Sequence, residues 1–391
     1  MKRITLNTYI CLLLAILFSA CRQEDLQVTP VGKPLAYSGP SKTVRQLMDS
    51  AGLTIYKAAW EQVNMDSVIA GKKLQAYTLL APSDAAFAAA GITAANIGST
   101  PVAVLDTIML YHTMDTWLSP GQLKALQGNM TMTSLLTRAD FADFRSYSPY
   151  ICYQFLGFHE GKLMVNGKPH PLTALEGIDG TIYVLDEVQP KPDQDMIDYL
   201  QNNPNFTFFM EACRLSDSLY DDMWLNQGFT DMLTTQQSSP KPITLLAPTN
   251  HAFQQAGINT FDDLRELALR YPVDWPHYND EWYYVPVYTS LDSLLMLHKL
   301  DFSMAARPQG PVVIFSNDMT DNPSLTNFLI TSGGRYQSPP HYIRLAFSTS
   351  GGQIMVKQEG NNTAPARTVT ATSPLFRNGV IHVIDDGLIV P

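Results

Sequence analysis

The sequence predicts two tandem copies of one unit that contains both helices and strands. One phrase occurs twice: residues 78–92 read TLLAPSDAAFAAAGI and residues 244–258 read TLLAPTNHAFQQAGI. A second pair of phrases closes each unit, DGTIYVLDEV at 179–188 and NGVIHVIDDG at 378–387. Self-similarity at this scale is the sequence signature of a duplicated structural unit. The opening phrases lie 166 residues apart and the closing phrases 199 apart, so the second copy holds 33 additional residues between its landmarks.

Each copy is expected to begin with a helix and to continue into a strand, a turn and a short helix. Apolar residues recur at helical spacing over 44–51 and again over 196–200. The opening phrases start with short apolar runs, 77–81 and 243–247, of the kind that form buried strands. In both copies a proline then ends the strand, a Ser or Thr can cap the short helix, and a glycine stops it: Pro82, Ser83 and Gly91, then Pro248, Thr249 and Gly257.

The closing phrases predict an interior strand in each copy. Asp179-Gly180 and Asn378-Gly379 are strong turn signals, since both dipeptides tolerate positive φ. The runs that follow, 181–185 and 380–384, are β-branched and apolar on both faces, as expected for strands covered on both sides. Each strand ends at an acidic residue followed by a loop, Asp186 in the first copy and Asp385 in the second.

The paired phrases TLLAPSDAAF with GTIYVLDEV, and TLLAPTNHAF with NGVIHVID, resemble the fasciclin domain, a secreted adhesion module. The resemblance covers about residues 41–391. It implies an α+β fold in which each copy is a wedge-shaped β-sandwich with surrounding helices, and a role in adhesion or binding. We therefore expect a first domain at 41–190 and a second at 193–391, which carries an aromatic insertion at about 271–290. Pro190-Lys191-Pro192 forms a short, stiff joint between them.

The amino terminus is predicted to be the signal peptide of a lipoprotein. Lys2 and Arg3 precede a short apolar run, and the small residues 19–20 precede Cys21. This order resembles the lipobox of bacterial lipoproteins, in which the cysteine is acylated; plain secretion with cleavage near residue 20 is the alternative. Residues 21–40 are expected to be a flexible tether. The acidic residues directly after Cys21 resemble the surface-export signal of some Gram-negative lipoproteins, which predicts an outer-membrane protein facing the cell surface; the alternative is that they only begin the tether.

The net charge excludes some classes of partner. Without residues 1–20 the chain carries 24 basic and 36 acidic residues, a balance of −12, which argues against nucleic acid and anionic lipid surfaces.

Apart from Cys11 in the signal peptide and Cys21 at the lipidation site, the chain has two cysteines, Cys152 and Cys213. Each copy contains one of them, so neither copy can form an internal disulfide. Two buried thiols are the favoured interpretation, and a bridge between the copies is the alternative.

The resemblance also points to one residue pair. The fasciclin family has a Tyr-His pair, implicated in adhesion by animal members, on a helix between its two motifs. Tyr111-His112 matches that pattern here, whereas the second copy has Leu297-His298. Helical spacing places His112 on the same face as Leu105 and Ile108, which favours a structural histidine that points at the core over a contact residue.

The insertion of the second copy is the candidate ligand site. Residues 271–288 read YPVDWPHYNDEWYYVPVY, and aromatic rings beside acids and amides suit a sugar-binding surface. Trp275, Tyr278, Trp282 and Tyr283 are the candidate contacts. The alternatives are a flap whose aromatic side chains pack back on the domain, and a patch that binds protein. The aromatic stretch 147–158 suggests the same in the first copy, more weakly.

The sequence contains none of the common catalytic or metal-binding motifs, and its histidines do not lie at ligand spacing, so we expect no enzyme, cofactor or metal. The function predicted is that of a surface-anchored, non-catalytic binding or adhesion lipoprotein that recognises an extracellular protein or glycan. The alternative is an accessory glycan-binding lipoprotein of a polysaccharide uptake system, which would use the aromatic insertion. A structural subunit of the envelope is the third interpretation.

Overall fold

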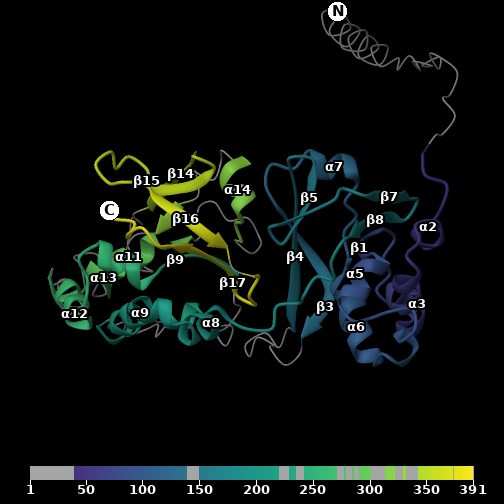
Figure 1. Cartoon of the computed structure of the whole chain (residues 1–391), viewed down its shortest axis with the longest axis horizontal. Helices are drawn as coiled ribbons and strands as arrows, with labels where there is room; N and C mark the ends of the chain where they lie inside the picture. The colour runs from purple at the N-terminus through teal and green to yellow at the C-terminus, as the bar shows by residue number, and fades with distance from the viewer. Residues whose placement is uncertain are drawn as a thin grey trace, which may run out of the picture. The chain divides into compact units, whose positions relative to one another are not determined.

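Two sheets, one from each copy of the repeated unit, organise the chain (Figure 1). The computed structural model describes residues 39–138, 149–219, 229–234, 242–270, 277–278, 284–285, 290–300, 313–321, 329–331, 342–372 and 374–390. Both sheets belong to one compact unit, Pro40–Pro391. The predicted combination of helices and strands in two copies is confirmed.

The first sheet has eight strands in the order β6-β5-β4-β3-β2-β1-β8-β7. Their bounds are β1 Tyr77–Pro82, β2 Thr113–Met114, β3 Met130–Arg138, β4 Tyr150–His159, β5 Lys162–Val165, β6 Lys168–His170, β7 Ala174–Gly177 and β8 Gly180–Leu185. The two strands predicted from the repeated phrases, β1 and β8, are neighbours and run parallel, in register from Tyr77 opposite Gly180 to Pro82 opposite Leu185. All other neighbours in this sheet are antiparallel.

Helices cover one face of β1 and β8, and the sheet curls over the other (Figure 1). The helices on that face are α2 Val44–Ser50, α3 Thr54–Val63, α4 Met65–Gly71, α5 Asp84–Ala89, the 3₁₀ helix η1 Ile97–Ser99 and α6 Val102–Tyr111. A further helix, α7 Pro120–Lys124, packs Leu123 on the opposite side of the strands. Leu79 and Ile182 point into the core under the helices. Leu80 and Tyr183 point to the other side, into a second core shared with Leu156 of β4. Both faces of the two strands are therefore buried, as their apolar sequences predict.

The second sheet repeats the central strand pair. Its order is β12-β9-β17-β16-β15-β14-β13, with β9 Ile243–Pro248, β12 Lys299–Leu300, β13 Leu329–Thr331, β14 Tyr342–Ser350, β15 Gln353–Gln358, β16 Arg367–Thr372 and β17 Gly379–Ile384. Parallel pairing of β9 with β17 runs from Ile243 opposite Gly379 to Pro248 opposite Ile384. The register matches that of β1 with β8, so the duplication is one of structure as well as sequence.

The helices of the second copy pack on the corresponding face of β9 and β17. They are α8 Met196–Asn202, the 3₁₀ helix η3 Pro204–Phe206, α9 Thr207–Leu219, α10 Phe229–Met232, α11 Asn250–Gln255, α12 Phe261–Leu269 and α13 Ser290–Leu297. A further helix, α14 Ser316–Asp321, packs Met319 with Leu246 and Ile384 on the opposite side of the strands. A separate two-stranded ladder pairs β10 His277–Tyr278 with β11 Tyr284–Val285, inside the aromatic insertion. Cys213 on α9 and Cys152 on β4 are both buried and form no disulfide, which confirms the expectation of buried thiols.

The predicted turn between strand and short helix is the same in both copies. The Ser83 hydroxyl accepts a hydrogen bond from the backbone N–H of Ala86, and the Thr249 hydroxyl accepts one from Ala252. Gly91 and Gly257 then leave the helix with φ of 81° and 83°, a conformation that favours glycine. Among the described residues, no helix is long and apolar enough to cross a membrane.

Candidate functional site

The Tyr-His motif lies at the carboxyl end of α6, inside the first copy. Tyr111 is the last residue of the helix and His112 is its cap. Their exposed fractions are 1% and 0%. The expectation that His112 faces the core is confirmed. Neither side chain can contact a partner while the fold is intact.

His112 joins the end of α6 to the segment that follows the closing strand. Its Nδ1 lies 2.8 Å from the carbonyl oxygen of Ile108, one helical turn earlier. Its Nε2 accepts a hydrogen bond of 3.0 Å from the backbone N–H of Gln189. Because Nε2 is an acceptor, the ring is the neutral tautomer that carries its proton on Nδ1. The ring thus connects two segments 77 residues apart.

The second copy makes the same connection with the histidine of its Leu-His pair. His298 Nδ1 lies 2.9 Å from the carbonyl oxygen of Leu294, and Nε2 accepts from the backbone N–H of Ile389 at 3.2 Å. The backbone carbonyls of the two histidines also accept from the opening strands, from Leu80 at 2.9 Å and Leu246 at 2.7 Å. We call this arrangement, in either copy, the histidine clip.

Burial determines the protonation state of the histidine ring in both clips. Loss of hydration lowers the pKa of His112 and of His298 to about 4, although the bond to a helix carbonyl acts in the opposite direction. Both rings are therefore neutral at pH 7. A neutral ring is the form that the clip requires, because a protonated Nε2 could not accept the bond from Gln189 or Ile389.

Tyr111, unlike the histidine, has no counterpart in the second copy. Its hydroxyl donates to the carbonyl of Tyr153 on β4 at 3.4 Å, which is long for an O–H···O bond. The ring packs with Leu136 and Cys152 in a small buried cluster. Leu297, the equivalent residue, is likewise fully buried. The tyrosine fills a space that leucine can also fill.

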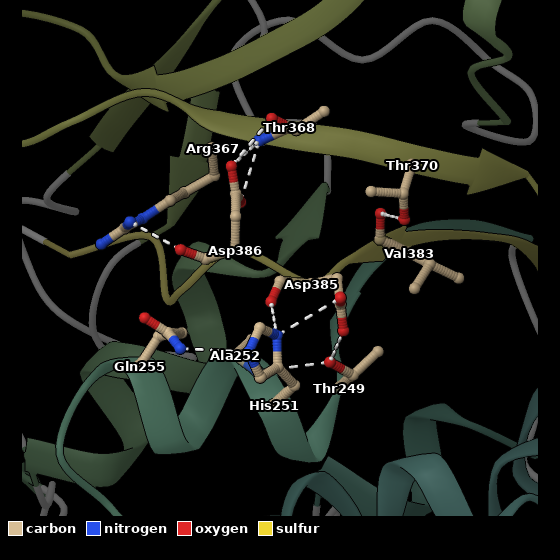
Figure 2. A network of polar contacts seen from close by, with 10 residues as sticks. All are labelled: Thr249, His251, Ala252, Gln255, Arg367, Thr368, Thr370, Val383, Asp385 and Asp386. Carbon is tan, nitrogen blue, oxygen red and sulfur yellow. Dashed lines mark hydrogen bonds and ion pairs between the residues drawn. The ribbon is translucent and has the colours of Figure 1, made fainter.

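The acidic residue that ends each closing strand is paired with a histidine, which the sequence did not indicate. In the second copy His251 of α11 faces Asp385 (Figure 2). Its Nδ1 lies 2.8 Å from the Asp385 carbonyl oxygen and 3.3 Å from a carboxylate oxygen, while Nε2 lies 3.0 Å from the amide nitrogen of Gln255. The Thr249 hydroxyl donates to the same carboxylate. Asp386 beside it accepts from the backbone N–H of Thr368 at 3.0 Å.

In the first copy the equivalent acid takes its histidine from a different element. His170, at the end of β6, places Nδ1 2.5 Å from a carboxylate oxygen of Asp186. The hydrogen bond from His170 lowers the pKa of the Asp186 carboxyl, against the opposing effect of burial. The imidazole is almost fully buried here, whereas His251 is 54% exposed. For the His251-Asp385 pair of the second copy, the only sequence signal is that His251 stands where the repeated phrase of the first copy has Ala85.

The Thr-Asp-His group of the second copy does not have the geometry of a hydrolytic triad. In such a triad the hydroxyl donates to the imidazole, and the carboxylate orients the imidazole from its other side. Here Thr249 donates directly to Asp385, and the far nitrogen of His251 meets Gln255. No path leads from the hydroxyl to the imidazole. Within the described ranges no three His, Cys, Asp or Glu residues are placed to hold a metal ion.

Most of the other predicted site residues lie outside the part of the chain that the structure describes. These are Cys21, Trp275, Trp282 and Tyr283. Tyr278 is described by its backbone alone, which pairs with Tyr284. The sugar-binding interpretation of the insertion therefore stays a prediction.

Comparison with known proteins finds a family model that matches the first copy. The family model described as the fasciclin domain aligns with part of the chain. Residues 51–189 match the fasciclin domain. The second copy lies beyond that match, but it repeats the landmark phrases, the parallel strand pair and the histidine clip, so we describe the chain as two fasciclin-like domains in tandem.

The whole chain has a similar structure among solved proteins. Among solved structures, the FAS1 domain pair from the insect cell adhesion molecule fasciclin I is similar to it with a TM-score of 0.30 and 13% identity. The alignment covers 88% of this chain and 98% of that one. A search of curated proteins found no match.

Proposed function

We propose that this protein is a non-catalytic binding lipoprotein, anchored through a lipid on Cys21 and displayed at the cell surface, that recognises an extracellular protein or glycan. The match of residues 51–189 to the fasciclin domain carries the proposal, because fasciclin domains are associated with adhesion and binding. The lipobox-like sequence before Cys21 and the acidic residues after it support the anchor and the outward orientation.

The partner has to bind somewhere other than the Tyr-His motif. Both residues are buried and their polar atoms are used inside the domain. Contact with a partner would require α6 to come away from the sheet. Since residues 21–391 carry a net charge of −12, a neutral or basic ligand surface fits better than an acidic one.

Protease treatment of intact cells tests the location. We expect an added protease to remove the protein from the surface while a periplasmic control survives. Complete protection of the protein, in cells whose known surface proteins are digested, would rule out the outward-facing orientation. A Cys21→Ser variant should appear in the soluble fraction if the lipid is the anchor.

Binding is tested with residues 22–391, which contain the whole compact unit. We would measure their binding to immobilised fibronectin, collagen and a polysaccharide array. Saturable binding to one of these surfaces, unchanged in Tyr111→Phe, is the expected result. Failure to bind any of them, by a protein shown to be folded, would contradict recognition of these ligand classes.

The aromatic insertion supports a second candidate, the glycan-binding component of a polysaccharide uptake system. Inside the insertion, residues 277–278 pair antiparallel with residues 284–285. A Trp275→Ala/Trp282→Ala double variant should lose binding to polysaccharide with unchanged thermal stability. Trp117→Ala, at a 42% exposed tryptophan in the first domain, is the matched control. A double variant that melts lower and binds normally would make the insertion a packed flap.

A further inference from the structure

We infer that the two fasciclin-like domains are locked into one fixed orientation by a clasp, residues 313–318, which the second domain inserts against the first. The segment lies directly before and within α14. With Val313, Ile314, Phe315, Asn317 and Asp318 all buried, it is an interior segment of the compact unit. Its partners in the first domain are residues of β4, the turn between β5 and β6, and Asn129 directly before β3.

Phe315 makes the apolar part of the clasp. It is fully buried, and its ring centroid lies 5.6 Å from that of Phe155 on β4. Val313 and Val380 complete the cluster, so one buried patch contains residues of both domains. The turn after β5 makes room for the ring with Gly167, whose φ is +78°. A Cβ atom at this position would lie 2.4 Å from Phe315 Cδ1, so no side chain fits there without displacing the phenyl ring.

Asp318 makes the polar part. Its carboxylate accepts hydrogen bonds from the backbone N–H of Asn129 at 2.5 Å and from the Asn129 side-chain amide at 2.7 Å. It also accepts from the backbone N–H of Phe315 at 2.8 Å, which holds the clasp in its own shape. A buried carboxylate is stable only when donors surround it. Two of these three bonds come from the other domain.

Asn129 contacts the clasp on one side and Gly157 of its own domain on the other. Its side-chain amide donates to Asn317 at 3.1 Å. Gly157 on β4 lies against the Asn129 side chain, and a Cβ atom there would lie 2.1 Å from Asn129 Oδ1. The polar contact is thus packed as closely as the apolar one.

A third contact fixes the joint between the domains. The Tyr150 hydroxyl of β4 donates to the carbonyl of Arg377 at 2.5 Å. The Arg377 guanidinium in turn donates to the carboxylate of Asp195 at 2.8 Å and to the carbonyl of Asp193 at 3.0 Å. The chain directly after Pro190-Lys191-Pro192 is therefore bonded to the second domain, and that domain is bonded to β4. The joint does not act as a hinge.

The clasp predicts one distance between the domains rather than a range. Spin labels at Lys72→Cys and Glu266→Cys, exposed positions in the first and second domains, report that distance in residues 22–391 by pulsed electron paramagnetic resonance. Cys152 and Cys213 are fully buried, and burial raises the pKa of the Cys213 thiol, so both should stay unlabelled. We expect a single narrow distance distribution. A distribution several times broader in the unmodified interface would overturn the inference.

Two variants separate the clasp from general stability. Phe315→Ala combined with Asp318→Ala removes both parts of the contact and should broaden the distance distribution at least twofold. Phe253→Ala is the matched control, because Phe253 is an equally buried phenylalanine within the core of the second domain. It should lower thermal stability and leave the distance unchanged. A clasp variant that is folded by circular dichroism and keeps the narrow distribution would also overturn the inference.

Discussion

The two domains differ at the tyrosine of the Tyr-His motif and agree at the histidine beside it. Tyr111 of the first domain is replaced by Leu297 in the second, whereas His112 and His298 make the same hydrogen bonds within 0.2 Å. The agreement extends to the first helix. Its first backbone N–H binds the side chain of Asp179 in one domain and of Asn378 in the other, at 2.7 and 2.9 Å. What the two domains share is a means of holding the closing strand, so the histidine of the motif serves the fold.

The largest effect should come from the glycine that begins each closing strand. A Cβ atom on Gly180 would lie 2.1 Å from the Tyr77 carbonyl oxygen, and one on Gly379 would lie 1.8 Å from that of Ile243. Alanine at either position must push the central strands apart, and we expect a loss above about 4 kcal/mol, at the extreme of single substitutions. Chemical denaturation measures it.

Gly91→Ala and Gly257→Ala are the matched controls. They too have positive φ, but a Cβ atom would meet nothing within 4 Å. The expected loss of stability is therefore only the cost of holding alanine at positive φ, about 1–2 kcal/mol. Equal losses of stability in the variants of Gly180 or Gly379 and of Gly91 or Gly257 would show that the close approach of the opening and closing strands does not depend on glycine.

Acid should destabilise the second domain more than the first. Burial lowers the pKa of His112, His298 and His382 to about 4, from a usual value of 6.5, and two of the three belong to the second domain. The unfolded chain takes up these protons first, so stability is lost as the pH falls from about 6.5 to about 4. Each ring contributes up to about 1.4 kcal/mol per pH unit.

Urea denaturation between pH 7.5 and 4.5 checks the acid effect, with hydrogen exchange reporting each domain separately. His382→Gln removes one titrating ring from the second domain and should make the pH dependence less steep. A wild-type stability that does not change between pH 6.5 and 5 would contradict the burial of neutral rings.

Removing either histidine clip should have the next largest effect, and the same effect in both domains. His112→Ala or His298→Ala leaves a buried backbone N–H without its acceptor, at Gln189 or Ile389, and opens a cavity. We expect a loss of about 3 kcal/mol in each case. His251→Ala, at an exposed ring, should cost less than about 1 kcal/mol. A large loss in one domain only would show that the clips are equivalent in geometry and not in energy.

The helix caps should distinguish the domains by a smaller amount. Ser83→Ala removes one capping bond and should cost about 1 kcal/mol. Thr249→Ala removes the same cap and also the hydrogen bond to Asp385, so its cost should be about twice as large. Thermal unfolding at pH 7 measures both. Identical shifts in melting temperature would mean that the Asp385 contact adds nothing.

The smallest effect is expected at Tyr111. The bond from its hydroxyl is 3.4 Å long, and the second domain has leucine at the same place. Tyr111→Phe should therefore change stability by less than about 1 kcal/mol and leave ligand binding unaffected. A variant that folds normally but fails to bind would restore Tyr111 as a contact residue.

The duplicated phrases made the centre of each domain predictable. They specify strand, turn, cap and closing strand within short stretches, and β1, β8, β9 and β17 form as expected. The antiparallel strands between residues 130 and 170 carry no repeated phrase, and their pairing depends on contacts that no local pattern encodes. The core-facing position of His112 followed from helical spacing, whereas the Tyr111-His112 pair was singled out by the family resemblance.

The interface between the domains could not be predicted in the same way. Phe315 and Asp318 stand in a segment with no motif. Phe155, the ring partner of Phe315, lies 160 residues earlier, and Asn129, which donates to Asp318, lies 189 residues earlier. The histidine partners of Asp186 and Asp385 come from different elements in the two domains, so the repeat itself conceals them. Residues 275, 282 and 283, which the sequence singled out most strongly, fall outside the described residues.

The parallel pairing of each opening strand with its closing strand also sets the order in which the chain can mature. β1 lies in the middle of its sheet, yet β8, which covers one of its edges, is made about 100 residues later. Until residue 189 has emerged, the first domain lacks both β8 and the backbone N–H of Gln189, which donates to His112 Nε2. Contacts of such long range form slowly, so a nascent chain would expose an apolar strand edge. Premature termination before residue 180 should yield an aggregating fragment rather than a smaller domain.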